Sequence, residues 1–316
     1  MSQEIVQVEQ LRHVYRKGKV AVDGITFGVR QGEIFGLLGP NGAGKTTTVR
    51  MLTTILRPTA GRAIVAGHDV AHEPLEVRRK IVAVLQENAV ETLLSTVDNL
   101  LLYGYLHGYS RAETRKRVDR VIAALGLEEH VDARAQTLSG GYKRRLQVAK
   151  ALMIDAPVIF LDEATTGMDP LIKRRVVELI REEAERGRTV VLTTQLLDEA
   201  EELCQRMVLM KEGKILSAGT MTELRQRAHK AFRLFVRFQQ DTPDAAAMLK
   251  ALAPRSLKTD HGAYEITVEG SEDRWIREMA RISERHPLEH LEIRAADLEQ
   301  IFFELYGDIA SEANAN

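Results

Sequence analysis

The stretch that decides the fold is residues 34–46, which read Ile34-Phe35-Gly36-Leu37-Leu38-Gly39-Pro40-Asn41-Gly42-Ala43-Gly44-Lys45-Thr46. Its apolar beginning gives way to a glycine-rich loop, and residues 45–56 after the loop contain neither glycine nor proline. This order predicts a buried strand, a tight loop and a helix. A loop that binds phosphate needs the same three elements in the same order.

The spacing of the glycines has a mechanical reason. Glycines let backbone N–H groups turn inward around phosphate oxygens, at a helix N-terminus whose dipole also favours negative charge. Lys45 would reach the β- and γ-phosphates of a nucleotide, and the Thr46 hydroxyl would hold Mg²⁺. The alternative is an ordinary glycine turn, but a chance match to this pattern in such a chain is about 1 in 100.

The composition limits the classes of protein that fit. Of 316 residues, 44% are hydrophobic, which suffices for one large and one smaller packed domain. Basic and acidic residues number 44 and 45, so the charge gives no support for nucleic acid as a partner. The single cysteine, Cys204, fits a packed residue in a reducing compartment. No stretch approaches the ~20 apolar residues that span a bilayer, and no signal-peptide pattern opens the sequence, so a membrane step would need another polypeptide.

The regions around the loop supply two further candidates. Short β-rich runs fill residues 4–29 and predict an antiparallel sheet beside the loop strand. Tyr15 lies in a turn of this region, where its ring could stack on a purine, although an ordinary half-buried tyrosine is the alternative. Strand 81–85 places Gln86 at its end, where the carboxamide could ligate Mg²⁺ or simply cap the strand.

Helical periodicity dominates residues 96–154, with helices predicted at 97–107, 111–125 and 142–154. This region is therefore a helical insertion, about 88–154, between strands of the core. The sequence Leu138-Ser139-Gly140-Gly141 precedes the last of these helices, and its N–H groups and hydroxyl would form a second anion-binding helix start. By itself Ser-Gly-Gly is a capped turn, but its place between the loop and the next strand favours a binding role.

Residues 158–163, Val-Ile-Phe-Leu-Asp-Glu, predict a buried strand that ends in two carboxylates. Ligands of open α/β sheets bind at the carboxyl ends of strands, so Asp162 can hold Mg²⁺ and Glu163 would face the attacking water. Without Lys45 upstream, the two acids would be ordinary surface residues. A further buried strand, 189–194, ends at Gln195, and the charged helix 197–206 after it is expected to face solvent.

Together these motifs resemble an ATP-binding cassette, and the chain is similar to the ATPase subunits of ABC transporters. The resemblance rests on the motifs above together with Thr166-Gly167-Met168-Asp169-Pro170 and residues 192–195, and it covers residues 4 to about 227. Within the family the phrasing is similar to the ABC-2 exporter group, in particular to daunorubicin-resistance-like ATPases. The resemblance implies an α/β P-loop NTPase fold with a RecA-like core, an antiparallel β subdomain and a helical subdomain.

The resemblance also implies the roles of the site residues, with ATP and Mg²⁺ as cofactors. Glu163 and Gln195 would serve catalysis, and Thr46, Gln86 and Asp162 would hold the metal. Nucleotide contacts would come from Tyr15, Gly39, Pro40, Asn41, Gly42, Ala43, Gly44, Lys45, Thr46, Thr47, Ser139, Gly140, Gly141 and Asp169. Three positions depart from the family pattern: Ala164 replaces a proline, Tyr142-Lys143 replaces the glutamine after the signature glycines, and Gln195 replaces a histidine. Only Gln195 affects the mechanism, because an amide can orient water but does not titrate near neutral pH.

The rest of the chain has a different order of predicted helices and strands. Residues 232–293 predict strand, helix, strand, strand, helix and strand, the order of a small α+β ferredoxin-like domain. We place the cassette at 4–228, this domain at 229–308 and a disordered tail at 309–316. Residues 297–305 resemble the C-terminal helix of ABC-2 ATPases. Regulation, dimer contact and simple packing all remain open as roles for the small domain.

By resemblance, we expect an ATPase that works as an ATP-bridged homodimer, with each nucleotide between Lys45 of one subunit and residues 139–141 of the other. The dimer would bind an ABC-2 type permease through residues near 100–109 at the cytoplasmic face of the cell membrane, and drive export of a drug, lipid or glycan. The alternatives are the ATPase of a binding-protein-dependent importer and a soluble non-transport cassette protein. The second lacks support, since the chain has neither two cassettes nor long heptad helices. A neighbouring gene for a permease alone would favour export, and one for a secreted binding protein would favour import.

Overall fold

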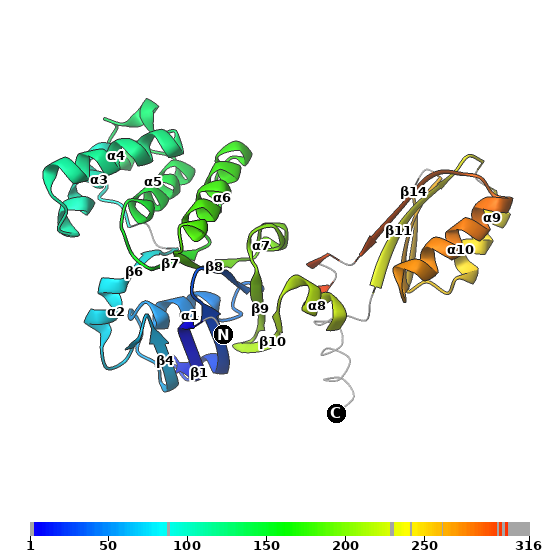
Figure 1. Cartoon of the computed structure of the whole chain (residues 1–316), viewed down its shortest axis with the longest axis horizontal. Coiled ribbons are helices and arrows are strands. Elements are labelled where there is room, and N and C mark those ends of the chain that lie inside the picture. The colour runs from blue at the N-terminus through cyan, green and yellow to red at the C-terminus, as the bar shows by residue number, and fades with distance from the viewer. Residues whose placement is uncertain are drawn as a thin grey trace. The chain divides into compact units, whose positions relative to one another are not determined.

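The computed structural model describes residues 3–86, 89–227, 231–240, 242–260, 262–295, 297–298 and 301–302. The chain divides into two compact units, Met1–Ala218 and Gly219–Asn316 (Figure 1). This division comes earlier than the boundary expected at residue 228, because the helix α8 (Met221–Arg227) groups with the second unit. The predicted tail 309–316 and part of the helix expected at 297–305 lie outside the described residues.

A six-stranded sheet forms the centre of the first unit, with strand order β10-β9-β3-β8-β7-β6. Every residue of β3, β7 and β8 is buried, which explains why these segments are continuous apolar runs. The strands from β9 to β6 pair in parallel, so their carboxyl ends meet at one edge of the sheet. The bounds are β3 (Ile34–Leu38), β6 (Ile81–Val84), β7 (Val158–Asp162), β8 (Thr189–Thr194), β9 (Arg206–Lys211) and β10 (Lys214–Gly219).

The expected antiparallel sheet is present, with strand order β2-β1-β4-β5. Its core joins that of the larger sheet, because the Phe27 ring stacks on the Phe35 ring with their centroids 5.4 Å apart. Val49 and Met51, from the helix after the glycine-rich loop, are fully buried in the same cluster. The strands are β1 (Glu4–Val14), β2 (Val20–Arg30), β4 (Ala60–Val65) and β5 (His68–Asp69).

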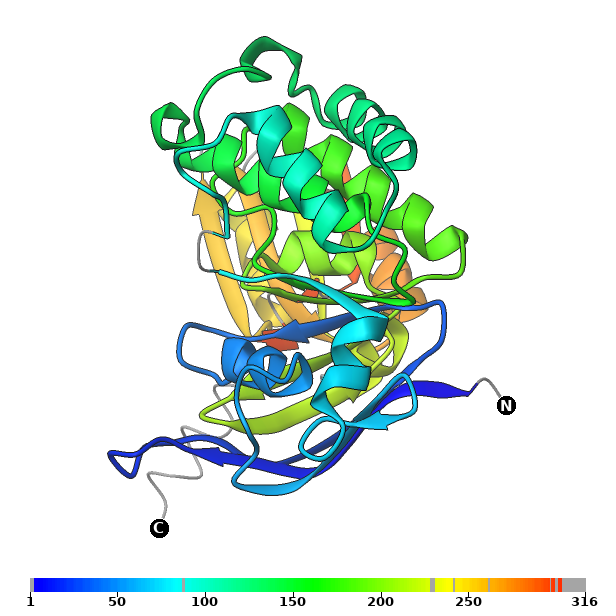
Figure 2. The ribbon, with the colours of Figure 1, turned by 90° about the vertical axis from the view of Figure 1, so that its left-hand side faces the viewer.

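The helical insertion is confirmed. Its helices α3, α4 and α5 gather away from the antiparallel sheet, with β6, β7 and β8 between (Figures 1 and 2). Ser95, Ser110 and Ser139 each accept a backbone hydrogen bond at a helix start, which satisfies a donor that the helix itself leaves free. The helices of this unit are α1 (Lys45–Leu52), α2 (Pro74–Lys80), α3 (Thr96–Leu106), α4 (Arg111–Leu125), α5 (Gly140–Leu152), α6 (Pro170–Glu185) and α7 (Leu197–Leu203), with short 3-10 turns at Glu128–His130 and Ala135–Thr137. Within the described ranges, no helix combines the length and apolar character needed to cross a bilayer.

The second unit has the predicted ferredoxin-like order. Its sheet, β12-β13-β11-β14, is antiparallel throughout, and Trp275, Met279 and Ile282 of one helix pack on the buried side chains of the sheet. Trp275 is 2% exposed and belongs to the core of this unit. The elements are β11 (Ala231–Phe238), α9 (Pro243–Ala251), β12 (Ser256–Asp260), β13 (Ala263–Glu269), α10 (Glu272–Arg285) and β14 (Leu288–Ala295).

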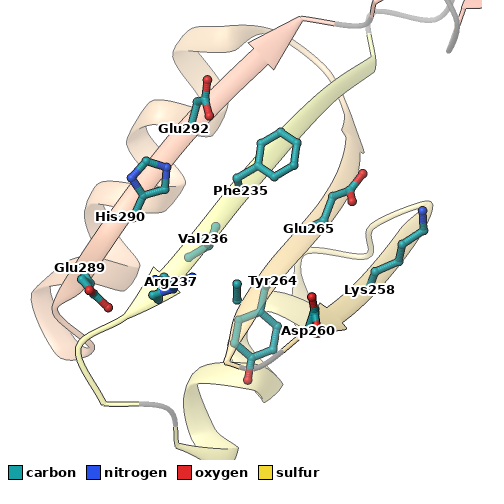
Figure 3. Close-up of a pocket in the computed structure, with 11 residues that line it drawn as sticks. Phe235, Val236, Arg237, Lys258, Asp260, Tyr264, Glu265, Glu289, His290 and Glu292 are labelled. Carbon is teal, nitrogen blue, oxygen red and sulfur yellow. The ribbon is translucent and has the colours of Figure 1, made fainter.

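The opposite face of this small sheet carries charged side chains around one aromatic ring. Figure 3 shows Phe235, Glu265 and Glu292 on three neighbouring strands, with the helices on the far side. Together with the ends of the strands they line a hollow of about 670 Å³. Alternation along the strands explains the arrangement, since Leu234 and Val236, the neighbours of Phe235 in sequence, point into the core.

Candidate nucleotide site

The glycine-rich loop joins β3 to α1, and its backbone requires glycine. Gly39, Gly42 and Gly44 have φ angles of +150°, +83° and +104°, which other residues rarely adopt. A Cβ atom on Gly39 would lie 2.3 Å from the carbonyl oxygen of Met210, and one on Gly44 would lie 2.5 Å from that of Ala21. The loop therefore has the left-handed turns and tight packing that aim backbone N–H groups inward at the start of α1.

Lys45, the first residue of α1, lies inside this loop. Its side chain is buried, and Nζ donates hydrogen bonds to the carbonyl oxygens of Gly39 (2.6 Å) and Pro40 (3.1 Å). Burial lowers the pKa of Lys45, while the nearby carboxylates of Glu163 and Asp162 act in the opposite direction. The ammonium group therefore lies between the loop and two acidic side chains, as a site for a polyanion requires.

Asp162 ends β7 and is fully buried. Its Oδ1 accepts hydrogen bonds from Thr46 Oγ1 (3.2 Å) and Thr193 Oγ1 (2.5 Å). Its Oδ2 is also buried, yet among the described residues it has no hydrogen-bond partner. A buried carboxylate oxygen without a partner calls for an explanation. An oxygen-ligated cation beside Thr46 supplies one, since Mg²⁺ is bound by one or two carboxylates, hydroxyls and phosphate oxygens.

Glu163 follows Asp162 in a conformation that costs energy. Its φ angle is +53°, in the left-handed region, which is unfavourable for a residue with a Cβ atom by about 1–3 kcal/mol. The conformation is held by its N–H, which donates to the carbonyl oxygen (3.1 Å) and to the hydroxyl (3.2 Å) of Thr193. Strain of this kind persists where the surroundings fix it, and it is concentrated at active sites.

The order of the strands brings the remaining candidates to the same edge. β8 lies between β3 and β7, so Gln195 at its end is placed between the phosphate loop and the acids. β6 pairs with β7, so Gln86 follows on the other side of Asp162. Both glutamines are exposed, in contrast to the acids. The four sequence motifs thus follow four adjacent parallel strands, and they meet at the carboxyl edge of the sheet. Figure 1 labels three of these strands, β6, β7 and β8.

Tyr15 is placed close to the loop helix by the turn between β1 and β2. Its hydroxyl lies 3.2 Å from Thr47 Oγ1, and its ring meets the edge of the His13 ring at a centroid distance of 4.7 Å. A hollow of about 530 Å³ beside it is lined by His13, Val14, Tyr15, Arg16, Lys17, Lys19 and Leu56. A half-buried aromatic ring within reach of the phosphate loop has the position needed to contact a base.

The helix start predicted at Ser139 is present as a capped turn. Ser139 caps α5 by accepting a hydrogen bond from the N–H of Tyr142 (3.2 Å), and Ser139 and Gly140 are exposed. A Cβ atom on Gly141 would lie 2.5 Å from the carbonyl oxygen of Gly167, so this motif packs on the loop before α6. Asp169 in that loop caps α6 through the N–H of Ile172 (3.0 Å). The two exposed helix starts therefore form one surface.

Some residues that support the two acids were not predicted from the sequence. Thr193 contacts both acids, and the buried Arg144 of α5 reaches the backbone at Asp162 and Glu163. A signal for Arg144 was present, because it shares the helix face of the apolar Val148 and Ala151. The helix after Gln195 was expected to face solvent, and this is wrong for Glu199, which is buried. Its carboxylate accepts hydrogen bonds from Thr165 (2.8 Å to each oxygen) and lies 3.7 Å from Lys173 Nζ.

Comparisons with known proteins agree with this geometry. The model of the ABC transporter family matches residues 22–166. The doxorubicin resistance ATP-binding protein DrrA of Mycobacterium tuberculosis is 43% identical over 263 residues, which are 83% of this chain and 78% of that protein. The daunorubicin/doxorubicin resistance ATP-binding protein DrrA of Streptomyces peucetius is 37% identical over 97% of this chain and 94% of its own. Among solved structures, an ATP-binding cassette described as a dimer in a post-hydrolysis state with ADP and Pi matches with a TM-score of 0.63 and 25% identity, over 68% of this chain and 98% of that one.

Proposed function

We propose, since this chain belongs to the family of ABC transporter ATP-binding subunits, that two copies of it close around two ATP molecules and drive export through a separate ABC-2 type permease. The chain is an ATPase, and the observation that supports the rest is the meeting of four motifs at one sheet edge. That edge carries Lys45, Asp162, Glu163 and Gln195. The exposed Ser-Gly-Gly motif, residues 139–141, lies instead at the start of α5 in the helical insertion. A site completed by a second copy accounts for both facts.

Binding of ATP is assigned to the loop and to the turn before β2. The N–H groups of residues 41–46 and the Lys45 ammonium group would hold the β- and γ-phosphates. The hydrogen bonds of Lys45 to Gly39 and Pro40 keep its side chain in the loop, so little rearrangement is needed for phosphate oxygens to become its acceptors. Tyr15 would lie against the adenine ring.

The residues also fit a magnesium ion. Thr46, Asp162 and Gln86 would hold it. The observation that favours this assignment is that Asp162 Oδ2 has no hydrogen-bond partner within the described part of the chain. Bound there, Mg²⁺ would neutralise charge on the phosphates.

Hydrolysis is assigned to Glu163, with Gln195 as the residue that orients the water. The water oxygen forms a bond to the γ-phosphorus while the bond from that phosphorus to the β,γ-bridging oxygen breaks, and ADP leaves. The carboxylate of Glu163 accepts the proton that the water loses. Gln195 can accept from the water through its carbonyl oxygen and donate to a phosphate oxygen through its NH₂ group.

The surface proposed to meet the permease lies on α3. Leu102, Tyr105 and Leu106 are 38%, 44% and 74% exposed, while Leu100, at the start of the region expected to form the contact, is fully buried. The proposed contact with the permease is therefore limited to the exposed side of α3. Exposed apolar side chains on a small helical subdomain are typical of surfaces that a partner covers.

The cargo is proposed only by class. Both relatives above are named for resistance to doxorubicin, which favours a drug among the expected cargo classes of drug, lipid and glycan. The role would place the chain at the cytoplasmic face of the cell membrane, as a peripheral subunit. The second unit, Gly219–Asn316, is given no catalytic role in this proposal.

Membrane fractionation with and without the permease tests the proposal. We expect the chain to sediment with membranes only when the neighbouring permease gene is co-expressed, and to lose this behaviour in Leu106→Arg. Ile276→Arg, which changes an exposed apolar residue of α10 (50% exposed), is the matched control and should leave sedimentation unchanged. Sedimentation without any permease, or equal behaviour of the two variants, contradicts the proposed contact.

A further inference from the structure

Arg144 is a buried cation that none of the assigned roles uses. It lies on α5, one and a half turns after Ser139, and is 8% exposed. Its guanidinium group donates hydrogen bonds to three backbone carbonyl oxygens: Nη2 to that of Asp162, Nε to that of Glu163 (3.3 Å) and Nη1 to that of Leu85. Nη1 also donates to Gln147 Oε1 (2.7 Å) on the same helix.

The chemistry of the group suits a fixed geometry. A guanidinium group is planar. When two neighbouring donors of the group bind successive backbone carbonyls, they fix the orientation of the two peptide planes that contain those carbonyls. These are the planes on either side of the Glu163 Cα atom, the residue with the strained φ angle of +53°. The third carbonyl belongs to Leu85, directly before Gln86. One side chain of α5 thus contacts the backbone at the general base and next to a metal ligand.

We propose that Arg144 is a positioning residue, which couples the orientation of the Glu163 carboxylate to the position of helix α5. This inference rests on the function proposed above for Glu163 and Ser139. When the second copy binds its nucleotide against the Ser139 end of α5, the helix would be held where its guanidinium group keeps Glu163 in the hydrolytic orientation. Displacement of α5 would move the same carbonyls and turn the base away from the water.

The competing explanation is that Arg144 only joins the helical insertion to the sheet. The chain offers a matched control for this possibility in Arg188. Its side chain is 12% exposed, and it donates to the carbonyl oxygens of Ile154 and Ala156 (2.8 Å each). Those carbonyls precede β7, at the end of the strand opposite to Asp162. Arg188 therefore makes the same kind of contact to the same segment, away from the chemistry.

The experiment compares Lys and Met variants at both positions in the full chain. A misplacement of about 1 Å can cost about 100-fold in rate. We expect Arg144→Met to lower kcat about 100-fold and Arg144→Lys about 10-fold, with the Kd for ATP within about threefold of the parent. Arg188→Met and Arg188→Lys should lower Tm but keep kcat within about twofold. If Arg144→Met does not fold, the Lys variant decides, since it keeps the charge and one donor.

A double mutant separates positioning from general stabilisation. In the Glu163→Gln background there is no base left to orient, so adding Arg144→Lys should change the single-turnover rate by less than about twofold. The inference is overturned if the rate losses of the two substitutions multiply in the double mutant. It is also overturned if Arg144→Lys keeps the parental kcat. If Glu163→Gln itself turns over at the parental rate, the function proposed for Glu163 falls and the inference falls with it. A Glu163→Gln loss without an Arg144 effect overturns the inference alone.

Discussion

Two surfaces of this protein carry clusters of charge, and they differ in how the charges are satisfied. At the carboxyl edge of the six-stranded sheet, Lys45, Asp162 and Glu163 are buried, and Asp162 Oδ2 has no partner among the described residues. On the open face of the small sheet, Arg233 pairs with Glu265 (3.5 Å), and Arg294 pairs with Glu292 while its guanidinium group lies 5.1 Å from the centre of the Phe235 ring. Glu265 and Glu292, the carboxylates of these two pairs, line the hollow of about 670 Å³ on this face (Figure 3).

This difference indicates where chemistry is to be expected. Exposed ion pairs contribute about 0–1 kcal/mol each and leave no demand unmet. A buried carboxylate oxygen without a donor, beside a cation whose pKa is lowered by burial, has a cost that folding alone does not recover. Binding of a charged ligand recovers it. A buried carboxylate oxygen of this kind therefore points to a binding site more directly than the hollow on the small sheet does.

The contrast predicts its largest effect at Glu163. Glu163→Gln should lower kcat by about 10²- to 10⁴-fold, because the carboxylate is the proton acceptor, while ATP still binds. With hydrolysis blocked, the dimer should persist in size-exclusion chromatography with ATP and Mg²⁺. Glu265→Gln removes the same charge from the open face and serves as the control, with phosphate release expected within twofold of the parent. A Glu163→Gln variant that turns over normally would remove the base from its role.

Gln195 comes next, since it lies between the loop and the acids but is exposed. Gln195→Ala should lower kcat about 10- to 1000-fold through loss of one positioning hydrogen bond, with the Kd for ATP nearly unchanged. Gln195→His should stay active and acquire a pH dependence between about 6 and 7.5, which the parent lacks, because only the imidazole titrates there. Rates that stay at the parental level in Gln195→Ala would show that Glu163 works without it.

A smaller effect is expected behind the edge, at Glu199. Its buried carboxylate ties Thr165, after the acids, to the helix that follows Gln195. Glu199→Gln exchanges an acceptor for a donor toward Lys173 and should lower the free energy of unfolding by about 1–3 kcal/mol, and kcat by several-fold at most. Urea unfolding and steady-state ATPase assays measure the two. Thr165→Ser keeps the hydroxyl and should behave as the parent, whereas a loss equal to that of Glu199→Gln would contradict the hydrogen-bond assignment.

The smallest effect belongs to the open face. Phe235→Ala removes the ring at its centre, and because the ring is only half-buried we expect a loss of about 1–2 kcal/mol in the stability of the second unit. ATP turnover should stay within twofold of the parent. Thermal unfolding and phosphate release measure the two quantities. A tenfold fall in turnover would erase the distinction between the two surfaces.

The strands and their ends were predictable because they are buried in runs of uninterrupted apolar residues. That property placed Asp162, Gln195 and the phosphate loop at strand ends, and parallel pairing then brings them together. The ferredoxin-like order was predictable for the related reason that alternation and turn residues recur along 232–293. The contacts of Arg144 were not, since they reach carbonyls 18 to 59 residues away and backbone acceptors leave no mark in the sequence. The burial of Glu199 was not predictable because its nearest hydrogen-bond partner, Thr165, is a neutral residue in a loop.

The position of Trp275 gives the protein a spectroscopic property. It is the only tryptophan in the sequence, and it lies in the core of the second unit, whereas every residue assigned to the nucleotide site belongs to the first unit. Intrinsic fluorescence excited at the indole band therefore reports on one unit alone, with no label attached. Its emission during denaturation follows the melting of the ferredoxin-like unit, while ATP turnover follows the cassette. A change in that emission when ATP is added would measure how much of the nucleotide signal crosses from one unit to the other.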